Sequence, residues 1–121
     1  MIIVDTSIWV DHFRRANEEI GRLLIMGQVV LHPFVYGELL LGGVPAQGAI
    51  GELLREMPVP STASPAEAAA FISWAKLSGT GVGYVDSHLL LSARMDFGGK
   101  VMTRDKSLLA EATRLGVAYA P

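Results

Sequence analysis

The chain contains no cysteine among its 121 residues. This absence excludes disulfide bonds, catalytic thiolates and zinc sites built from cysteine ligands. No apolar run approaches the roughly 20 residues that a membrane-spanning helix needs, and the first residues lack the basic stretch and cleavage site of a secretory signal peptide. We therefore expect a single domain over residues 1–121, located in the cytoplasm and without a membrane partner.

An excess of positive charge is also missing, since 10 Lys and Arg residues stand against 12 Asp and Glu residues. Proteins that coat nucleic acid usually carry a basic excess, so any RNA binding must depend on a local patch. Half of the residues are hydrophobic and only 18% are charged. Because a small domain buries such a share of apolar residues with difficulty, the composition predicts surfaces that partner subunits cover.

Segments of strand character alternate with segments of helical periodicity along the chain. Strands are expected at 2–4, 29–31, 100–103 and 117–119, with Val59 as a further short candidate. Helices are expected at 6–15, 17–27, 33–41, 46–56, 64–77, 84–96 and 105–115. This alternation predicts an α/β fold in which helices cover both faces of a parallel sheet.

Two aspartates follow predicted strands. Asp5 comes directly after the strand at 2–4, and Asp105 comes just after the strand at 100–103. Open α/β sheets bind their ligands at the carboxyl ends of the strands, which favours a functional role for both. Aspartate is also a preferred helix N-cap, and capping explains each position about equally well.

Glu38 is predicted to share a helical face with apolar residues, namely Phe34, Val35 and Leu41. A carboxylate on an apolar stripe is costly unless it has a partner, so this position indicates a function. The alternative is that Glu38 lies at the edge of the stripe and reaches water.

Asp86 repeats this pattern in the next acidic segment. Its neighbours at i+3, i+4 and i+7 are all apolar. The helix dipole favours an acid in a first turn, which explains the residue type but not the face on which it lies. The glycines at 79, 81 and 83 predict a flexible connection that lets this helix approach the site. The three apolar neighbours are Leu89, Leu90 and Ala93.

These four carboxylates can converge on one crevice. Crowded carboxylates repel one another, which raises some of their pKa values unless a cation neutralises them. The chain offers no cysteine and only the scattered His12, His32 and His88 as other ligands, so the expected cation is Mg²⁺ or Mn²⁺. Such a cation binds phosphate oxygens and activates water, which is the chemistry of phosphodiester hydrolysis.

Four motifs containing these acids resemble the acidic motifs of PIN domains in type and order. They are VDTSIW at 4–9, YGELL at 36–40, GYVDSHLL at 83–90 and TRDKSL at 103–108. The resemblance covers nearly the whole chain. It implies a three-layer α/β/α fold with a central, mostly parallel sheet, and a Mg²⁺-dependent endoribonuclease. It also implies that Asp5, Glu38, Asp86 and Asp105 form the metal site, with Asp5 and Asp86 as its principal ligands.

The resemblance further implies that Ser7 and Thr103 offer hydroxyl groups to the same pocket. Arg104 and Lys106 flank Asp105 and are candidates for contact with phosphate. The single compact domain resembles the VapC toxins of bacterial toxin/antitoxin pairs, which implies a VapB-type antitoxin and a homodimer. One alternative remains, a PIN-like module that binds or scaffolds without catalysis. Its expected sign is the loss of one or more acids, whereas this chain keeps all four.

Overall fold

Three parallel strands form the centre of the computed structural model, which describes residues 1–121. Strand β1 (Ile2–Val4) lies between β2 (Val29–Val30) and β3 (Lys100–Met102). Ile3 pairs with Val30 on one side and with Val101 on the other. Every residue of β1 and β2 is buried, as expected for a parallel sheet that is covered on both faces.

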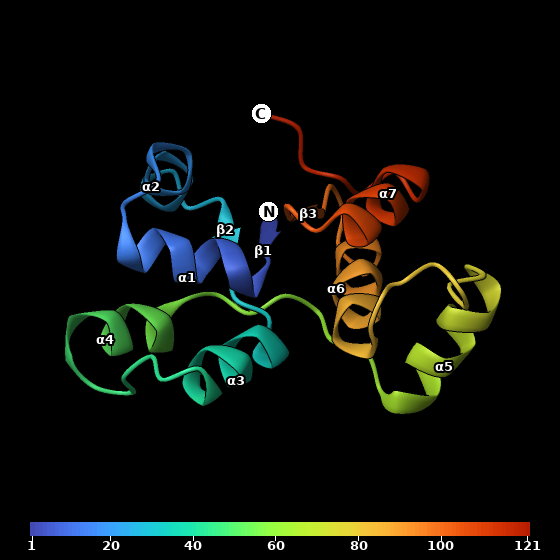
Figure 1. The fold of residues 1–121 in the computed structure, drawn as a ribbon, viewed down its shortest axis with the longest axis horizontal. Coiled ribbons are helices and arrows are strands. Elements are labelled where there is room, and N and C mark those ends of the chain that lie inside the picture. The colour runs from blue at the N-terminus through green and yellow to red at the C-terminus, as the bar shows by residue number, and fades with distance from the viewer.

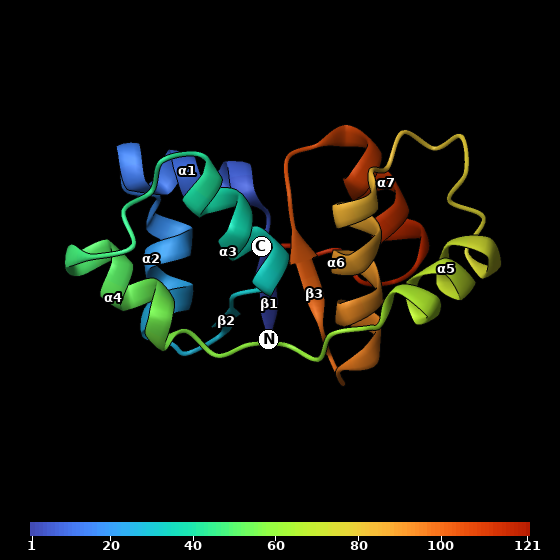
Figure 2. The ribbon, with the colours of Figure 1, turned by 90° about the horizontal axis from the view of Figure 1, so that it is seen from below.

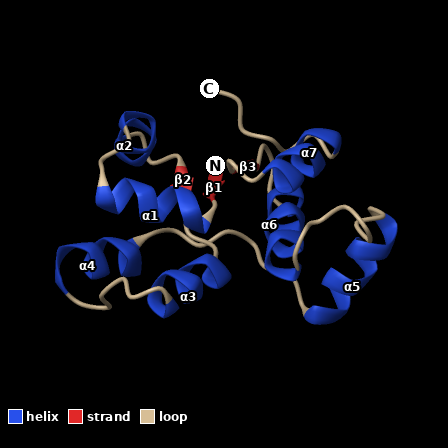
Figure 3. Cartoon of the chain, in the orientation of Figure 1, coloured by secondary structure: helices blue, strands red, loops and turns tan.

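Seven helices surround these short strands (Figure 3). Helices α1 to α4 gather on one side of the strands, and α5 to α7 gather on the other (Figures 1 and 2). Helix α6 contacts both β1 and β3, while α7 contacts β3. The predicted α/β architecture with a central parallel sheet is therefore confirmed. The helices are α1 (Thr6–Arg14), α2 (Glu18–Ile25), α3 (Pro33–Leu41), α4 (Gly48–Glu56), α5 (Pro65–Trp74), α6 (Tyr84–Met95) and α7 (Lys106–Arg114).

Local sequence signals account for where several helices begin. Ser64 and Glu67 form the predicted capping box at the start of α5, with each side chain bonded to the backbone of the other residue. Pro33 occupies the first turn of α3, where its missing N–H leaves no hydrogen bond unmade. A core of 23 buried hydrophobic residues then joins the sheet to the helices on both sides.

Two predicted strands do not form, while those predicted at 29–31 and 100–103 each end one residue early. Val59 is exposed and forms no strand, because it stands between Pro58 and Pro60, which have no backbone N–H to pair. The segment 117–119 forms only an isolated parallel bridge between Val101 and Ala118. No helix combines the length and the hydropathy that crossing a bilayer would require.

Candidate active site

The carboxyl ends of β1 and β3 bring the first and the last acidic motif together. Both strands run toward the starts of α1 and α7 (Figure 2). The Thr103 hydroxyl donates to Asp5 Oδ2 over 2.7 Å and accepts the Asp105 backbone N–H over 3.0 Å. One buried side chain, 8% exposed, thus connects two acids that lie at opposite ends of the sequence.

Asp5 and Asp105 also cap helices, as the alternative explanation held. Asp5 Oδ1 accepts the N–H of Thr6, and Asp105 Oδ1 accepts the N–H of Leu108. Each of these bonds uses one lone pair of one oxygen, and a carboxylate offers about four such acceptor positions. Capping therefore fixes the orientation of both carboxylates and leaves acceptor positions for another ligand.

Glu38 reaches the same place from α3. The Thr6 hydroxyl donates to Glu38 Oε1 over 2.7 Å, which holds Glu38 beside the start of α1. The predicted face is wrong, however, because Glu38 is exposed and the core side of α3 is formed by Val35 and Leu39. The other two members of the predicted stripe, Phe34 and Leu41, are exposed as well. Glu38 lies at the surface of the site and not against the core.

The hydroxyl beside Glu38 belongs to Thr6, a residue that the sequence motifs did not indicate. Ser7, the predicted contributor, is exposed and forms no hydrogen bond with any of the four acids. Thr6 follows Asp5 directly, so its position as the first residue of α1 was the available signal. Thr103, the other predicted hydroxyl, lies where it was expected.

Asp86 enters from the first turn of α6 and is half-buried. Its Oδ2 accepts the Gly83 N–H over 3.3 Å. Burial raises the pKa of Asp86, the bond from Gly83 opposes this rise, and the negative charges of the other three acids add to it. The three apolar neighbours predicted to share its helical face are indeed buried.

The structure therefore brings the four predicted acids to one edge of the sheet, close enough to affect the ionisation of Asp86. They come from four different helix starts or helices, and no three acidic or histidine side chains form a ready-made ligand group. Their carboxylate oxygens are the groups at this edge that could hold a metal ion. Whether they do so stays a prediction.

The two predicted phosphate contacts differ in their surroundings. Arg104 Nη2 forms an ion pair of 2.9 Å with Asp11 Oδ2 on α1. Lys106, the first residue of α7, is exposed and forms no ion pair. Both flank Asp105 at the surface, where a phosphate group can approach them.

Two of the three histidines, His32 and His12, have structural roles, as expected. His32 caps α3 by accepting the Phe34 N–H over 3.0 Å, and its other ring nitrogen lies 3.1 Å from Ser92 Oγ. Burial, assisted by nearby His88, lowers the pKa of His32 to about 4. His12 Nδ1 accepts the backbone N–H of Asn17 just beyond the end of α1.

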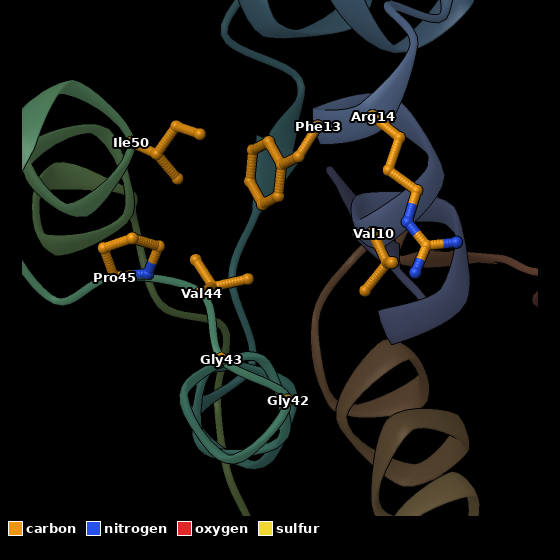
Figure 4. Close-up of a pocket in the computed structure, with 8 residues that line it drawn as sticks. All are labelled: Val10, Phe13, Arg14, Gly42, Gly43, Val44, Pro45 and Ile50. Carbon is orange, nitrogen blue, oxygen red and sulfur yellow. The ribbon is translucent and has the colours of Figure 1, made fainter.

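A mainly apolar hollow of about 230 Å³ lies away from the acids, between α1 and the connection from α3 to α4. Figure 4 shows Phe13, Val44, Pro45 and Ile50 around this hollow and Arg14 at its edge. None of the four acids lines it.

Comparisons with known proteins give a consistent assignment. No protein-family model matches the chain. The chain is 35% identical over 120 residues to Ribonuclease VapC32 of two Mycobacterium tuberculosis strains, and the match covers 99% of this chain and 97% of that protein. The crystal structure of PAE2754 from Pyrobaculum aerophilum has a similar fold, with a TM-score of 0.61 at 15% identity over 95% of this chain and 96% of that one. Sequence identity over the full length thus shows that this chain belongs to the VapC family of PIN-domain ribonucleases.

Proposed function

We propose that this chain is a Mg²⁺-dependent endoribonuclease, the toxin of a type II toxin/antitoxin pair, and that Mn²⁺ can replace Mg²⁺. The observation that carries this proposal is the position of Asp86, half-buried among three other carboxylates that oppose its ionisation. A hard divalent cation would stabilise all four in the ionised form. The oxygen-only donor set fits Mg²⁺ and Mn²⁺, which prefer such ligands.

Asp5, Glu38, Asp86 and Asp105 would hold the cation, which when bound supplies an activated water and neutralises charge on the phosphate. The remaining residues orient these acids. Thr103 fixes one oxygen of Asp5, and Thr6 fixes one oxygen of Glu38. The Gly83 N–H does the same for Asp86. This support holds the carboxylates in place before RNA arrives.

The first test is cleavage of total cellular RNA by the purified protein with Mg²⁺, with Mn²⁺ or with excess EDTA. We expect cleavage with either metal and none with EDTA, because the water cannot be activated without the cation. Cleavage that survives EDTA in a clean preparation contradicts the metal mechanism. A protein that cleaves RNA under none of these conditions supports the alternative of a non-catalytic binding or scaffold module.

A pair of glutamate variants distinguishes the loss of a carboxylate at the site from a general change in the charge of the protein. Glu38→Gln removes one carboxylate charge at the site, and Glu52→Gln removes one from an exposed residue of α4. We expect Glu38→Gln to lose cleavage by orders of magnitude and Glu52→Gln to keep it. Equal activity of the two variants contradicts the assignment of Glu38.

A VapB-type antitoxin and a second copy of the chain are the proposed protein partners. Several large apolar side chains lie exposed, among them Ile25 at 89%, Leu41 at 90% and Phe97 at 106%. Such exposure supports surfaces that a partner covers. The expected observations are a dimer in analytical ultracentrifugation, growth arrest when the chain is expressed alone, and relief of that arrest by its antitoxin. A harmless, strictly monomeric protein contradicts this part of the proposal.

A further inference from the structure

A basic hollow of about 410 Å³ is lined in part by Arg104, the residue that directly precedes Asp105. The hollow lies between the C-terminal end of α1 and the connection from β3 to α7. We infer that this hollow binds backbone phosphates of the RNA strand next to the position of cleavage, an inference that rests on the proposed function. The residues that line it are Asp11, Arg14, Arg15, Ala16, Asn17 and Arg104.

Both walls of the hollow continue into the acidic site. Arg104 directly precedes Asp105, and α1 begins directly after Asp5. Nine residues of helical rise separate Asp5 from Arg14, a distance of about 13 Å along α1. An RNA strand whose reacting phosphate lies at the acids therefore has room to place a neighbouring phosphate over the hollow.

The charges in the hollow favour an anion. Three guanidinium groups line it together with one carboxylate, that of Asp11. Arg14 and Arg15 form no ion pair. The whole chain has a formal charge of −2, so RNA binding requires a local basic patch of this kind. Arginine suits phosphate because its planar group can donate two parallel hydrogen bonds.

A purely structural explanation accounts for part of this patch. Basic residues are favoured in the last turn of a helix, where the free carbonyl groups concentrate negative charge. Arg14 and Arg15 stand at the end of α1 and satisfy that preference. Arg104 comes from a different segment and faces the same hollow, which helix polarity does not explain.

Asp11 holds Arg104 across the hollow in the free protein, through an ion pair in which both side chains are more than half exposed. A phosphate that binds Arg104 must compete with this carboxylate. Removing the Asp11 charge therefore leaves Arg104 free for RNA, and Asp11→Asn should bind RNA a few-fold more tightly than its parent.

The test measures binding of a labelled single-stranded RNA by fluorescence anisotropy over a range of salt concentrations. All proteins carry Asp86→Asn and are kept in EDTA, so that the RNA stays intact. Arg14→Gln, Arg15→Gln and Arg104→Gln should each weaken binding, and each should reduce the log–log salt slope by about 0.7. Arg22→Gln is the matched control, since Arg22 is an exposed arginine ion-paired with Glu19 on α2.

The inference is overturned if the three arginine variants bind with the affinity and salt slope of Arg22→Gln, or if the parent protein does not bind RNA. RNA cleavage by the protein that retains Asp86, measured with Mg²⁺ or Mn²⁺, tests the proposed function separately. Cleavage combined with arginine-independent binding refutes the hollow alone. Arginine-dependent binding by a protein that never cleaves RNA supports the hollow and refutes the nuclease.

Discussion

Thr103 shows how much of the site depends on one small side chain. Its hydroxyl has a partner on each side, Asp5 Oδ2 and the Asp105 N–H. Thr103→Val keeps the shape and removes both bonds, so we expect a loss of about 1–3 kcal/mol in unfolding free energy, together with lower cleavage. Urea unfolding measures the first effect. The control is Thr113→Val, where the lost bond to Leu109 O is exposed and the expected change is about 0.5 kcal/mol or less. Equal losses in both variants contradict this prediction.

Asp86 connects stability to pH with a definite sign. Because its pKa is raised above 3.8 in the folded protein, the folded state holds this proton more tightly than the unfolded chain does. The contribution of Asp86 to the unfolding free energy of wild type is fully present at low pH. It is lost as the pH rises from about 4 through the raised pKa. Asp86→Asn cannot titrate and can still accept the Gly83 N–H. We therefore expect its melting temperature in EDTA to exceed that of wild type by more near pH 7 than near pH 4.

Cleavage and stability together test whether Asp86 is a metal ligand. Cleavage by Asp86→Asn should fall by orders of magnitude under conditions in which it is fully folded. If Asp86 were a structural anchor, the same change would lower the melting temperature in EDTA, and activity would fall only with the folded fraction. A destabilised but active variant would refute the ligand assignment.

Residue types and spacing were enough to place the four acids near one another, but not to describe each side chain. Asp5 and Asp105 follow strands whose carboxyl ends must meet in a parallel sheet, so their proximity was predictable. Which hydroxyl faces the site depends on the rotation of α1 about its axis. If α1 began one residue later, Ser7 would take the position that Thr6 has at the site. Sequence patterns do not resolve the start of a helix to one residue. The exposed position of Glu38 depended likewise on which side of α3 meets the core.

At the scale of elements, the connection from α5 to α6 packs against α7 just before Asp86. Gly81 has a φ of +89°, and a Cβ there would lie 2.7 Å from Ser107 Oγ in the first turn of α7. This close approach places the start of α6 beside the start of α7. The glycine connection thus packs directly against α7, and its predicted flexibility stays a prediction.

Gly81→Ala should disturb the packing between these two helix starts. Adding a methyl group requires Ser107 Oγ to rotate away, leaves Ser107 Cβ only 3.3 Å from the added carbon, and also strains the positive φ. Gly98→Ala is the control, because Gly98 has a φ of +71° and open space around its Cα. We expect both variants to lose roughly 1 kcal/mol of unfolding free energy from backbone strain, and Gly81→Ala alone to lose cleavage as well. Full activity of Gly81→Ala would show that the close packing does not position the site.

Helix and strand patterns gave the order of the elements, while their ends depended on local backbone geometry. Helix α5 ends at Trp74, three residues before the predicted end at 77. Lys76, with a φ of 55°, is the non-glycine residue of positive φ that follows it. Glycine normally supplies this conformation at a helix end, so the sequence carried no signal for the earlier stop.

For the molecule as a whole, metal binding should appear as added stability. A ligand that binds only the folded state stabilises it by about 2.7 kcal/mol at a concentration 100 times its Kd. Mn²⁺ should therefore raise the melting temperature of wild type and have little effect on Asp86→Asn. Scanning calorimetry with matched ionic strength measures this difference. Equal shifts in both proteins would mean that the ion binds elsewhere, and no shift would favour a scaffold without metal.

The place of β1 in the sheet has a consequence for the newly made protein. The first strand of the chain is the central one, and one of its edges stays open until β3, at residues 100–102, has been synthesised. The bond from Thr103 to Asp5 joins residues 98 positions apart. Contacts between residues so distant in sequence form late, since a long loop must close first. A chain still emerging from the ribosome accordingly carries three of its four acids without the arrangement that unites them, and the proposed nuclease stays inert until β3 and Asp105 have been synthesised and β3 has paired with β1.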